Sequence, residues 1–132
     1  MNADTEFAHA ALTHQIIGAA MEVLNTLGHG FHEKPYEQAL LVELGLRGLA
    51  CDQQRSFPIC YKGVDVGVYI PDLVVNSCIV TDTKVVDRIT DHERGQMINY
   101  LRISMCEVGL IINFSRPKLE WERIVLRKRR SS

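Results

Sequence analysis

The stretch IPDLVVNSCIVTDTK, residues 70–84, decides the fold class of this chain. Two runs rich in β-branched residues, 73–75 and 78–86, lie on either side of Asn76-Ser77, a pair typical of a tight turn. The pattern predicts two neighbouring strands joined by this turn. An aspartate stands at the end of the first strand and an Asp-x-Lys triplet lies in the second. The sheet is therefore expected to carry charged groups among valine and isoleucine.

Asp72, Asp82 and Lys84 form the candidate catalytic group. Asp82 and Lys84 are two positions apart on one strand, so their side chains leave the same face, while Thr83 points to the opposite face. The short turn brings Asp72 alongside. Burying charged groups without partners is costly, and a divalent cation would offset that cost. Because Mg²⁺ prefers carboxylate oxygens and retained waters, we expect its protein ligands to be Asp72, Asp82 and the Thr83 backbone carbonyl.

Such a site would hydrolyse a phosphodiester bond. The ion would polarise the phosphate and lower the pKa of a bound water, and Lys84 would hold that water or offset charge in the transition state. The alternative is an ordinary salt bridge between Lys84 and an aspartate on a sheet edge. Gln96 and Tyr100 favour the site, because they are four apart on one face of the helix that follows. A solvated polar helix face is the alternative for that pair. Glu33 adds another carboxylate that the fold could direct at the metal.

Three helices are predicted around the sheet. Apolar residues recur at helical spacing in residues 12–27, and the glycines that follow provide the stop. A similar pattern that starts at Tyr36 and ends in Arg47-Gly48 predicts the second helix. Thr90 and Glu93 have the spacing of a capping box, so the third helix is expected to begin there.

Four further strands are predicted. Lys62-Gly63 marks the tight turn of a hairpin. The strand after the third helix is apolar throughout, as expected for burial on both faces. The predicted strands are 57–61, 64–70, 108–114 and, at a sheet edge, 121–126. The order ααβββαββ is typical of an α/β fold, a mixed β-sheet flanked by helices.

Composition and charge indicate one domain without a global attraction to nucleic acid. The chain has 132 residues, 46% of them hydrophobic, and a formal net charge of -1, so residues 1–126 are expected to form a single domain. Residues 127–132 are a basic tail expected to be disordered, which could solubilise the chain or bind phosphates. The sequence has no membrane span or secretory signal, which predicts a cytoplasmic location.

Cysteine and histidine patterns do not indicate a dedicated metal cluster. His29, His32 and Glu33 lack the helical spacing of a zinc protease site. The four thiols are spread along the chain without a CxxC pair, so free buried thiols are expected rather than disulfides, a zinc ribbon or an iron–sulfur cluster. They are Cys51, Cys60, Cys78 and Cys106.

Several segments, taken together and in this order, carry a family resemblance. The longest is GFHEKPYEQAL, residues 30–40. The others are IIGAA (16–20), YKG (61–63), PDL (71–73), DTK (82–84), QMINY (96–100) and LIINF (110–114). They resemble the GxxExxY proteins, a small bacterial group within the PD-(D/E)xK nuclease superfamily. The chain departs from that group where Asp82-Thr83-Lys84 replaces the usual Glu-Leu-Lys, and where Pro71 replaces a small or basic residue.

The resemblance implies a restriction-endonuclease-like fold and a nuclease that cleaves DNA with Mg²⁺ or Mn²⁺, in the manner of RecB-like exonucleases. A nuclease of 15.0 kDa that cuts both strands would act as a homodimer. The alternative function is a catalytically inactive nuclease-fold module that joins a larger complex through its apolar surface or its basic tail. The RecB-like pattern, with its Gln-x-x-x-Tyr element, implies roles for Glu33, Asp72, Asp82, Lys84, Gln96 and Tyr100.

Overall fold

The computed structural model describes residues 2–127, with side chains from residue 9 onward. Its helices and strands follow one another in the order ααβββββαββ. They are α1 (Asn2–Leu27), α2 (Glu33–Leu46), β1 (Cys51–Gln53), β2 (Phe57–Tyr61), β3 (Val64–Tyr69), β4 (Leu73–Val75), β5 (Ile79–Lys84), α3 (Asp91–Ser104), β6 (Val108–Asn113) and β7 (Glu120–Val125).

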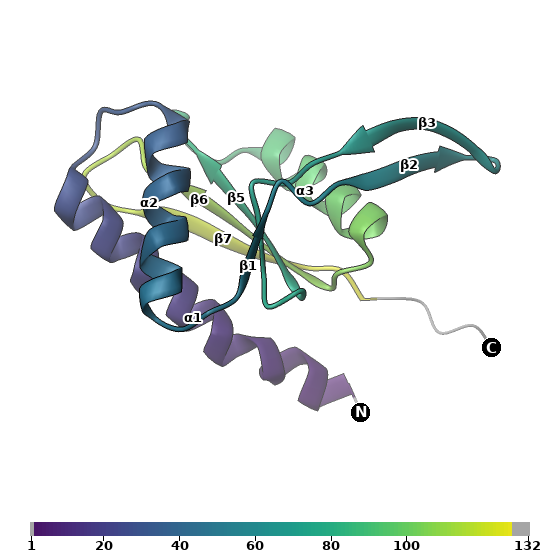
Figure 1. Ribbon diagram of the computed structural model, residues 1–132, viewed down its shortest axis with the longest axis horizontal. Coiled ribbons are helices and arrows are strands. Elements are labelled where there is room, and N and C mark those ends of the chain that lie inside the picture. Colours follow the sequence, from purple (N-terminus) through teal and green to yellow (C-terminus); the bar gives the residue numbers. More distant parts are fainter. Residues whose placement is uncertain (1, 128–132) are drawn as a thin grey trace.

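Five of the strands form one mixed sheet at the centre of the molecule (Figure 1). Its order is β1-β4-β5-β6-β7. The central pair β5–β6 is parallel, because α3 carries the chain back across the sheet between them, whereas the other neighbours are antiparallel. The fold class predicted from the sequence, a mixed α/β sheet flanked by helices, is therefore confirmed.

Helices cover both faces of this sheet, so the fold has three layers. α1 and α2 pack on one face and α3 packs on the other. The inward residues of β5 divide accordingly: Ile79 contacts the α1–α2 side, and Val80 contacts Met97 and Leu101 of α3. Both faces of β6 are buried, as its apolar sequence predicted.

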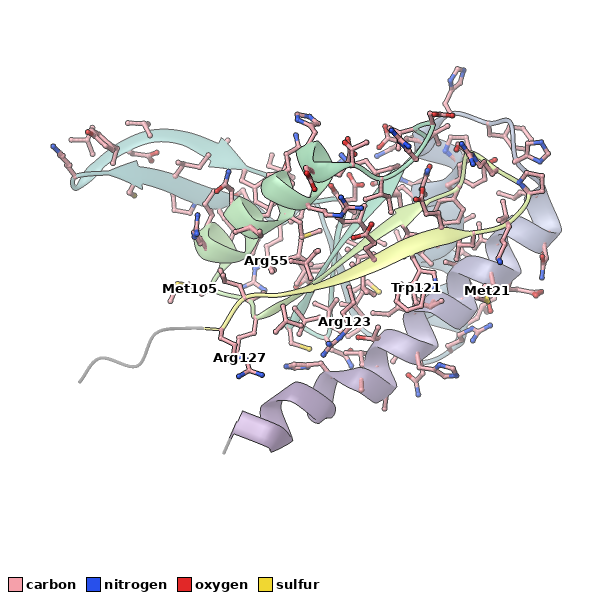
Figure 2. All side chains as sticks on the ribbon, turned by 180° about the vertical axis from the view of Figure 1, so that it is seen from behind. Met21, Arg55, Met105, Trp121, Arg123 and Arg127 are labelled. Carbon is pink, nitrogen blue, oxygen red and sulfur yellow. The ribbon has the colours of Figure 1, made fainter. Side chains whose placement is uncertain are left out.

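The hairpin β2–β3 is separate from the main sheet and projects beyond the end of α3 (Figures 1 and 2). Its strands pair antiparallel around the Lys62-Gly63 turn, where both residues have positive φ, and a register shift interrupts the pairing at Ile59/Cys60. Valines are exposed along β3, namely Val64, Val66 and Val68. The predicted hairpin is confirmed, but it lies outside the sheet to which the sequence order assigned it.

Other local predictions hold with shifted boundaries. Thr90 caps α3 and its backbone N–H donates to Glu93 Oε1 at 2.7 Å, so the capping box is present. β7 occupies an edge of the sheet, as predicted. α1 begins ten residues before the predicted Leu12, and α2 ends at Leu46. None of the helices in residues 2–127 is both long enough and apolar enough to cross a bilayer.

Two expectations were wrong. Five strands separate α2 from α3, whereas the expected order has three. β1 was not predicted, and that order counts residues 73–86 as a single strand although the turn at Asn76-Ser77 divides them into two, the second of which stops at Lys84. The four cysteines are free, but they are not buried: Cys60 is exposed and the other three are half-buried. Of the expected disordered tail, residues 128–132 lie outside the described part of the chain.

Candidate active site

Asp82 and Lys84 project from the same face of β5, the strand between β4 and β6. Lys84 Nζ lies 3.2 Å from Asp82 Oδ2. Asp82 is only 7% exposed. The salt bridge of the alternative interpretation is present, but not on a sheet edge. It lies on β5, the middle strand of the sheet.

Asp72 lies immediately before β4, where Pro71 separates that strand from β3. Antiparallel pairing places Leu73 opposite Thr81, so Asp72 reaches the end of β5 that carries Asp82. Asp72 Oδ2 accepts two hydrogen bonds from Thr83, one from the backbone N–H at 2.9 Å and one from the hydroxyl at 3.0 Å. Thr83 thus fixes the orientation of the Asp72 carboxylate.

Asp82 is the group on which the charges of the site converge. Burial and, after it, the negative charge of Asp72 raise the pKa of Asp82 to about 7, although Lys84 opposes both. For Lys84, burial acts to lower the pKa, but the Asp82 carboxylate outweighs burial and holds the pKa above its usual value. Lys84 is therefore a stable ammonium ion, suited to offset charge rather than to accept a proton.

Glu33 begins α2 and lies within electrostatic range of Lys84 and Asp72. Loss of hydration raises the pKa of its carboxyl; the Lys84 ammonium opposes this, and the negative charge of Asp72 adds to it. Within the described residues, however, no three His, Cys, Asp or Glu side chains gather closely enough to hold a metal ion. The structure brings Asp72 and Asp82 together and leaves Glu33 outside a closed cage.

The donor set nevertheless fits a divalent cation in its chemistry. Buried Asp82, half-buried Asp72 and a third acid nearby carry more negative charge than the single ammonium of Lys84 balances. Burial is the main cause of the high pKa of Asp82 and this uncompensated negative charge adds to it. A hard cation prefers carboxylate oxygens of this kind.

Tyr100 lies close enough to the site for the charges of Asp82 and Lys84 to act on its hydroxyl. The Tyr100 ring stacks on Tyr69 with a centroid distance of 3.9 Å. Burial, followed by the negative charge of Asp82, raises the pKa of its hydroxyl. Gln96 lies one turn earlier on α3, half-buried, and no hydrogen bond within the described residues joins it to the carboxylates.

The end of β5 is held in place by the neighbouring strand. The backbone N–H of Phe114 donates to the Lys84 carbonyl at 2.9 Å. The Asn113 side chain accepts from the Val86 N–H at 3.1 Å and donates to the Val86 carbonyl at 2.9 Å. The segment that follows Lys84 is therefore fixed through side-chain bonds to β6.

Sequence reasoning missed two residues near the site. Glu37 is buried on α2 and accepts from Lys34 at 3.1 Å and from Gln53 at 2.9 Å, which ties the helix to β1. Tyr69 ends β3 and stacks on Tyr100. The available signal for Tyr69 was a single aromatic residue in a valine-rich strand, three positions before Asp72.

Comparison with known proteins agrees with this geometry. A family model described as the PD-(D/E)XK nuclease superfamily matches residues 10–124. The crystal structure of SSO0001 is similar in fold, with a TM-score of 0.53 and 16% sequence identity, over 94% of this chain. The chain spans 59% of the length of that solved protein. No curated protein gives a significant match.

Proposed function

Because the chain belongs to the PD-(D/E)XK nuclease superfamily, we propose that it is a nuclease that hydrolyses phosphodiester bonds of DNA with the help of Mg²⁺ or Mn²⁺. The observation that carries the proposal is the buried Asp82–Lys84 pair with Asp72 beside it. Exonuclease-like cleavage and a homodimer that acts on both strands are further parts of the proposal. Within the superfamily, we infer membership of the GxxExxY group.

Each residue of the site has its own role in the proposed reaction. Asp72, Asp82 and the Thr83 carbonyl would hold the cation, and Glu33 would assist from α2. When bound, the cation would polarise the phosphate and lower the pKa of a coordinated water. Lys84, kept as an ammonium by Asp82, would position the attacking water and offset negative charge at the phosphate. Tyr100, with Gln96 one turn away on α3, would orient the phosphate or Lys84.

The GxxExxY motif divides into a structural and a functional part, which supports the subgroup assignment. Tyr36 is fully buried, stacks on Phe114 at 4.7 Å and donates to the Gly28 carbonyl at 2.7 Å. It therefore holds the turn between α1 and α2. Glu33, one helical turn earlier, is left facing Lys84 and Asp72. The tyrosine of the motif positions its glutamate.

Lys84→Ala tests the proposal. Loss of a preorganised charge at such a site is expected to cost about 3 kcal/mol of transition-state stabilisation, or about a hundredfold in the rate of DNA cleavage with Mn²⁺. Lys118→Ala is the matched control, because Lys118 is exposed in the loop before β7. Circular dichroism checks that both variants keep the fold. Cleavage by Lys84→Ala at the wild-type rate would refute the proposed role.

A catalytically inactive module is the second candidate, and the exposed valines of the hairpin favour it. Calorimetry separates the two functions. The nuclease should bind Mn²⁺, and Asp72→Asn should weaken that binding because it removes a charged ligand. Wild-type protein that gives no heat with Mg²⁺ or Mn²⁺ at millimolar concentration would favour the module.

A further inference from the structure

Tyr69 has a hydroxyl that nothing in the described chain satisfies. Its side chain is nine-tenths buried, and its hydroxyl has no hydrogen-bond partner among the described residues. Buried polar groups in proteins are nearly always paired, since an unpaired buried hydroxyl loses its hydrogen bonds to water without replacing them. The missing partner is therefore expected to lie outside the described residues, in a molecule bound at the site.

The hydroxyl lies within electrostatic range of the two aspartates of the candidate active site. Burial raises its pKa strongly, and the negative charges of Asp82 and Asp72 raise it further, with Asp82 the larger of the two. A phenol in this environment stays protonated and can donate a hydrogen bond. Because it makes no hydrogen bond to either aspartate, its proton remains free for another acceptor bound at the same place.

The ring is held rigidly in this position. It stacks on Tyr100 at 3.9 Å with planes 12° apart, and Phe57 stacks at 6.4 Å with planes 24° apart. Tyr69 thus joins the base of the hairpin to α3. A rigid donor beside a carboxylate pair is well placed to act on an anion that a cation brings there.

We propose that Tyr69 contacts the substrate, its hydroxyl donating a hydrogen bond to a non-bridging oxygen of the phosphate bound at Asp72 and Asp82. The assignment rests on the proposed nuclease function and deepens it by naming a residue that binds the phosphate. An ammonium and a phenol would then approach the phosphate from different elements, Lys84 from β5 and Tyr69 from β3.

Tyr69→Phe tests the assignment, because it removes the hydroxyl and keeps the ring stack. A hydrogen bond to a charged group is worth enough to lower kcat/KM for DNA cleavage at least about tenfold. The affinity of the Mn²⁺-loaded protein for thymidine 5′-monophosphate should fall by a similar factor. The Mn²⁺ affinity and Tm should not fall, since the variant loses an unsatisfied group. Tyr61→Phe, at the exposed hairpin tip, is the matched control and should resemble wild type.

The outcomes separate this assignment from the function on which it rests. Wild-type protein that neither cleaves DNA nor binds the mononucleotide overturns both. If wild-type protein cleaves DNA and Tyr69→Phe matches it in cleavage rate or in mononucleotide affinity, only the phosphate contact is overturned. A fall in Mn²⁺ affinity in Tyr69→Phe would also overturn it, because the hydroxyl would then act through the metal ligands.

Discussion

The main sheet and the β2–β3 hairpin contain the same kinds of residue, but these residues are buried in the sheet and exposed in the hairpin. The valines of β4 are fully buried, whereas Val64, Val66 and Val68 of β3 are 57–62% exposed. β-branched residues favour an extended backbone in both regions. Only the main sheet has helices on its two faces. Strand propensity therefore sets the conformation, and neighbouring elements decide whether the strand stabilises a core.

The two regions meet at the candidate active site. Tyr69, at the base of the hairpin, stacks on Tyr100, and Tyr100 lies near the buried charge of Asp82. The exposed hairpin is thus linked to the buried charge of the site through this stack. Matched substitutions in the two regions would show how far their energetics differ.

Of the matched substitutions, those at Asp82 and its control are expected to differ most in their effect on the free energy of unfolding. Its pKa is 3.8 in an ordinary environment and about 7 in the folded protein. Over the window between these values the native state keeps a proton that the unfolded state has lost, so the free energy of unfolding decreases as pH rises. The loss for metal-free protein is up to about 4 kcal/mol. Urea unfolding of wild type and Asp82→Asn across this range measures it.

The control in the hairpin is Asp65→Asn. Asp65 is exposed and accepts a bond of 3.3 Å from the Gly67 N–H, so this variant should follow the wild-type pH profile. The comparison fails if the stability difference between wild type and Asp82→Asn does not change with pH. Mn²⁺ should restore stability to wild type near neutral pH, because the cation would compensate the second charge.

Truncation of isoleucine gives the next largest contrast. Ile112 is fully buried in β6, and Ile112→Ala should lower the free energy of unfolding by about 3 kcal/mol through lost burial and a cavity. Ile70, just after the hairpin, is 52% exposed, and Ile70→Ala should cost less than about 1 kcal/mol. Denaturant unfolding of both variants checks this. Equal losses would mean that the hairpin is packed against something in solution.

Replacing a glycine by alanine should give a smaller difference in stability between the main sheet and the hairpin. A Cβ at Gly109 would lie 2.3 Å from Met97 Sδ and 3.3 Å from a Leu101 methyl carbon, because α3 approaches β6 closely there. Gly109→Ala should therefore cost about 2 kcal/mol. A Cβ at Gly67 in the hairpin would meet Ile59 at 3.8 Å, an ordinary contact. Gly67→Ala should change Tm little, and a loss as large as that of Gly109→Ala would contradict the open hairpin.

The smallest effect is expected for a buried hydroxyl. Thr81 in β5 is fully buried and its hydroxyl has no partner among the described residues. Thr81→Val keeps the shape and removes the unsatisfied group, so it should raise the free energy of unfolding by about 1 kcal/mol. The reverse exchange in the hairpin, Val66→Thr, should stay within about 0.5 kcal/mol of wild type. A destabilised Thr81→Val would show that the hydroxyl has a partner in solution, such as a buried water.

The sequence predicted what depends on local pattern. Alternation and turn residues located the hairpin, and Thr90 with Glu93 located the start of α3. β1 was missed because Cys51–Gln53 is a short, polar segment that becomes a strand only by pairing with β4. Exposure of the hairpin was missed because a run of valines looks the same whether helices cover it or not.

The candidate site was predicted in part for a similar reason. Period-two spacing placed Asp82 and Lys84 together, and the salt bridge between them agrees with it. The bonds from Thr83 to Asp72 depend on how the residue before β4 meets the end of β5. The stack of Tyr69 on Tyr100 depends on contact between a hairpin and a helix far apart in sequence. Neither arrangement can be predicted from the local sequence pattern.

An exposed hairpin with two open edges would be expected to recruit strands from other copies and to form fibrils. β2 and β3 contain three features that oppose such growth. Pro58 lacks an N–H for an incoming strand, the register shift at Ile59/Cys60 distorts the ladder, and Asp65 adds charge to the other edge. The irregularity of this small ribbon thus protects the protein from polymerising through its own valines.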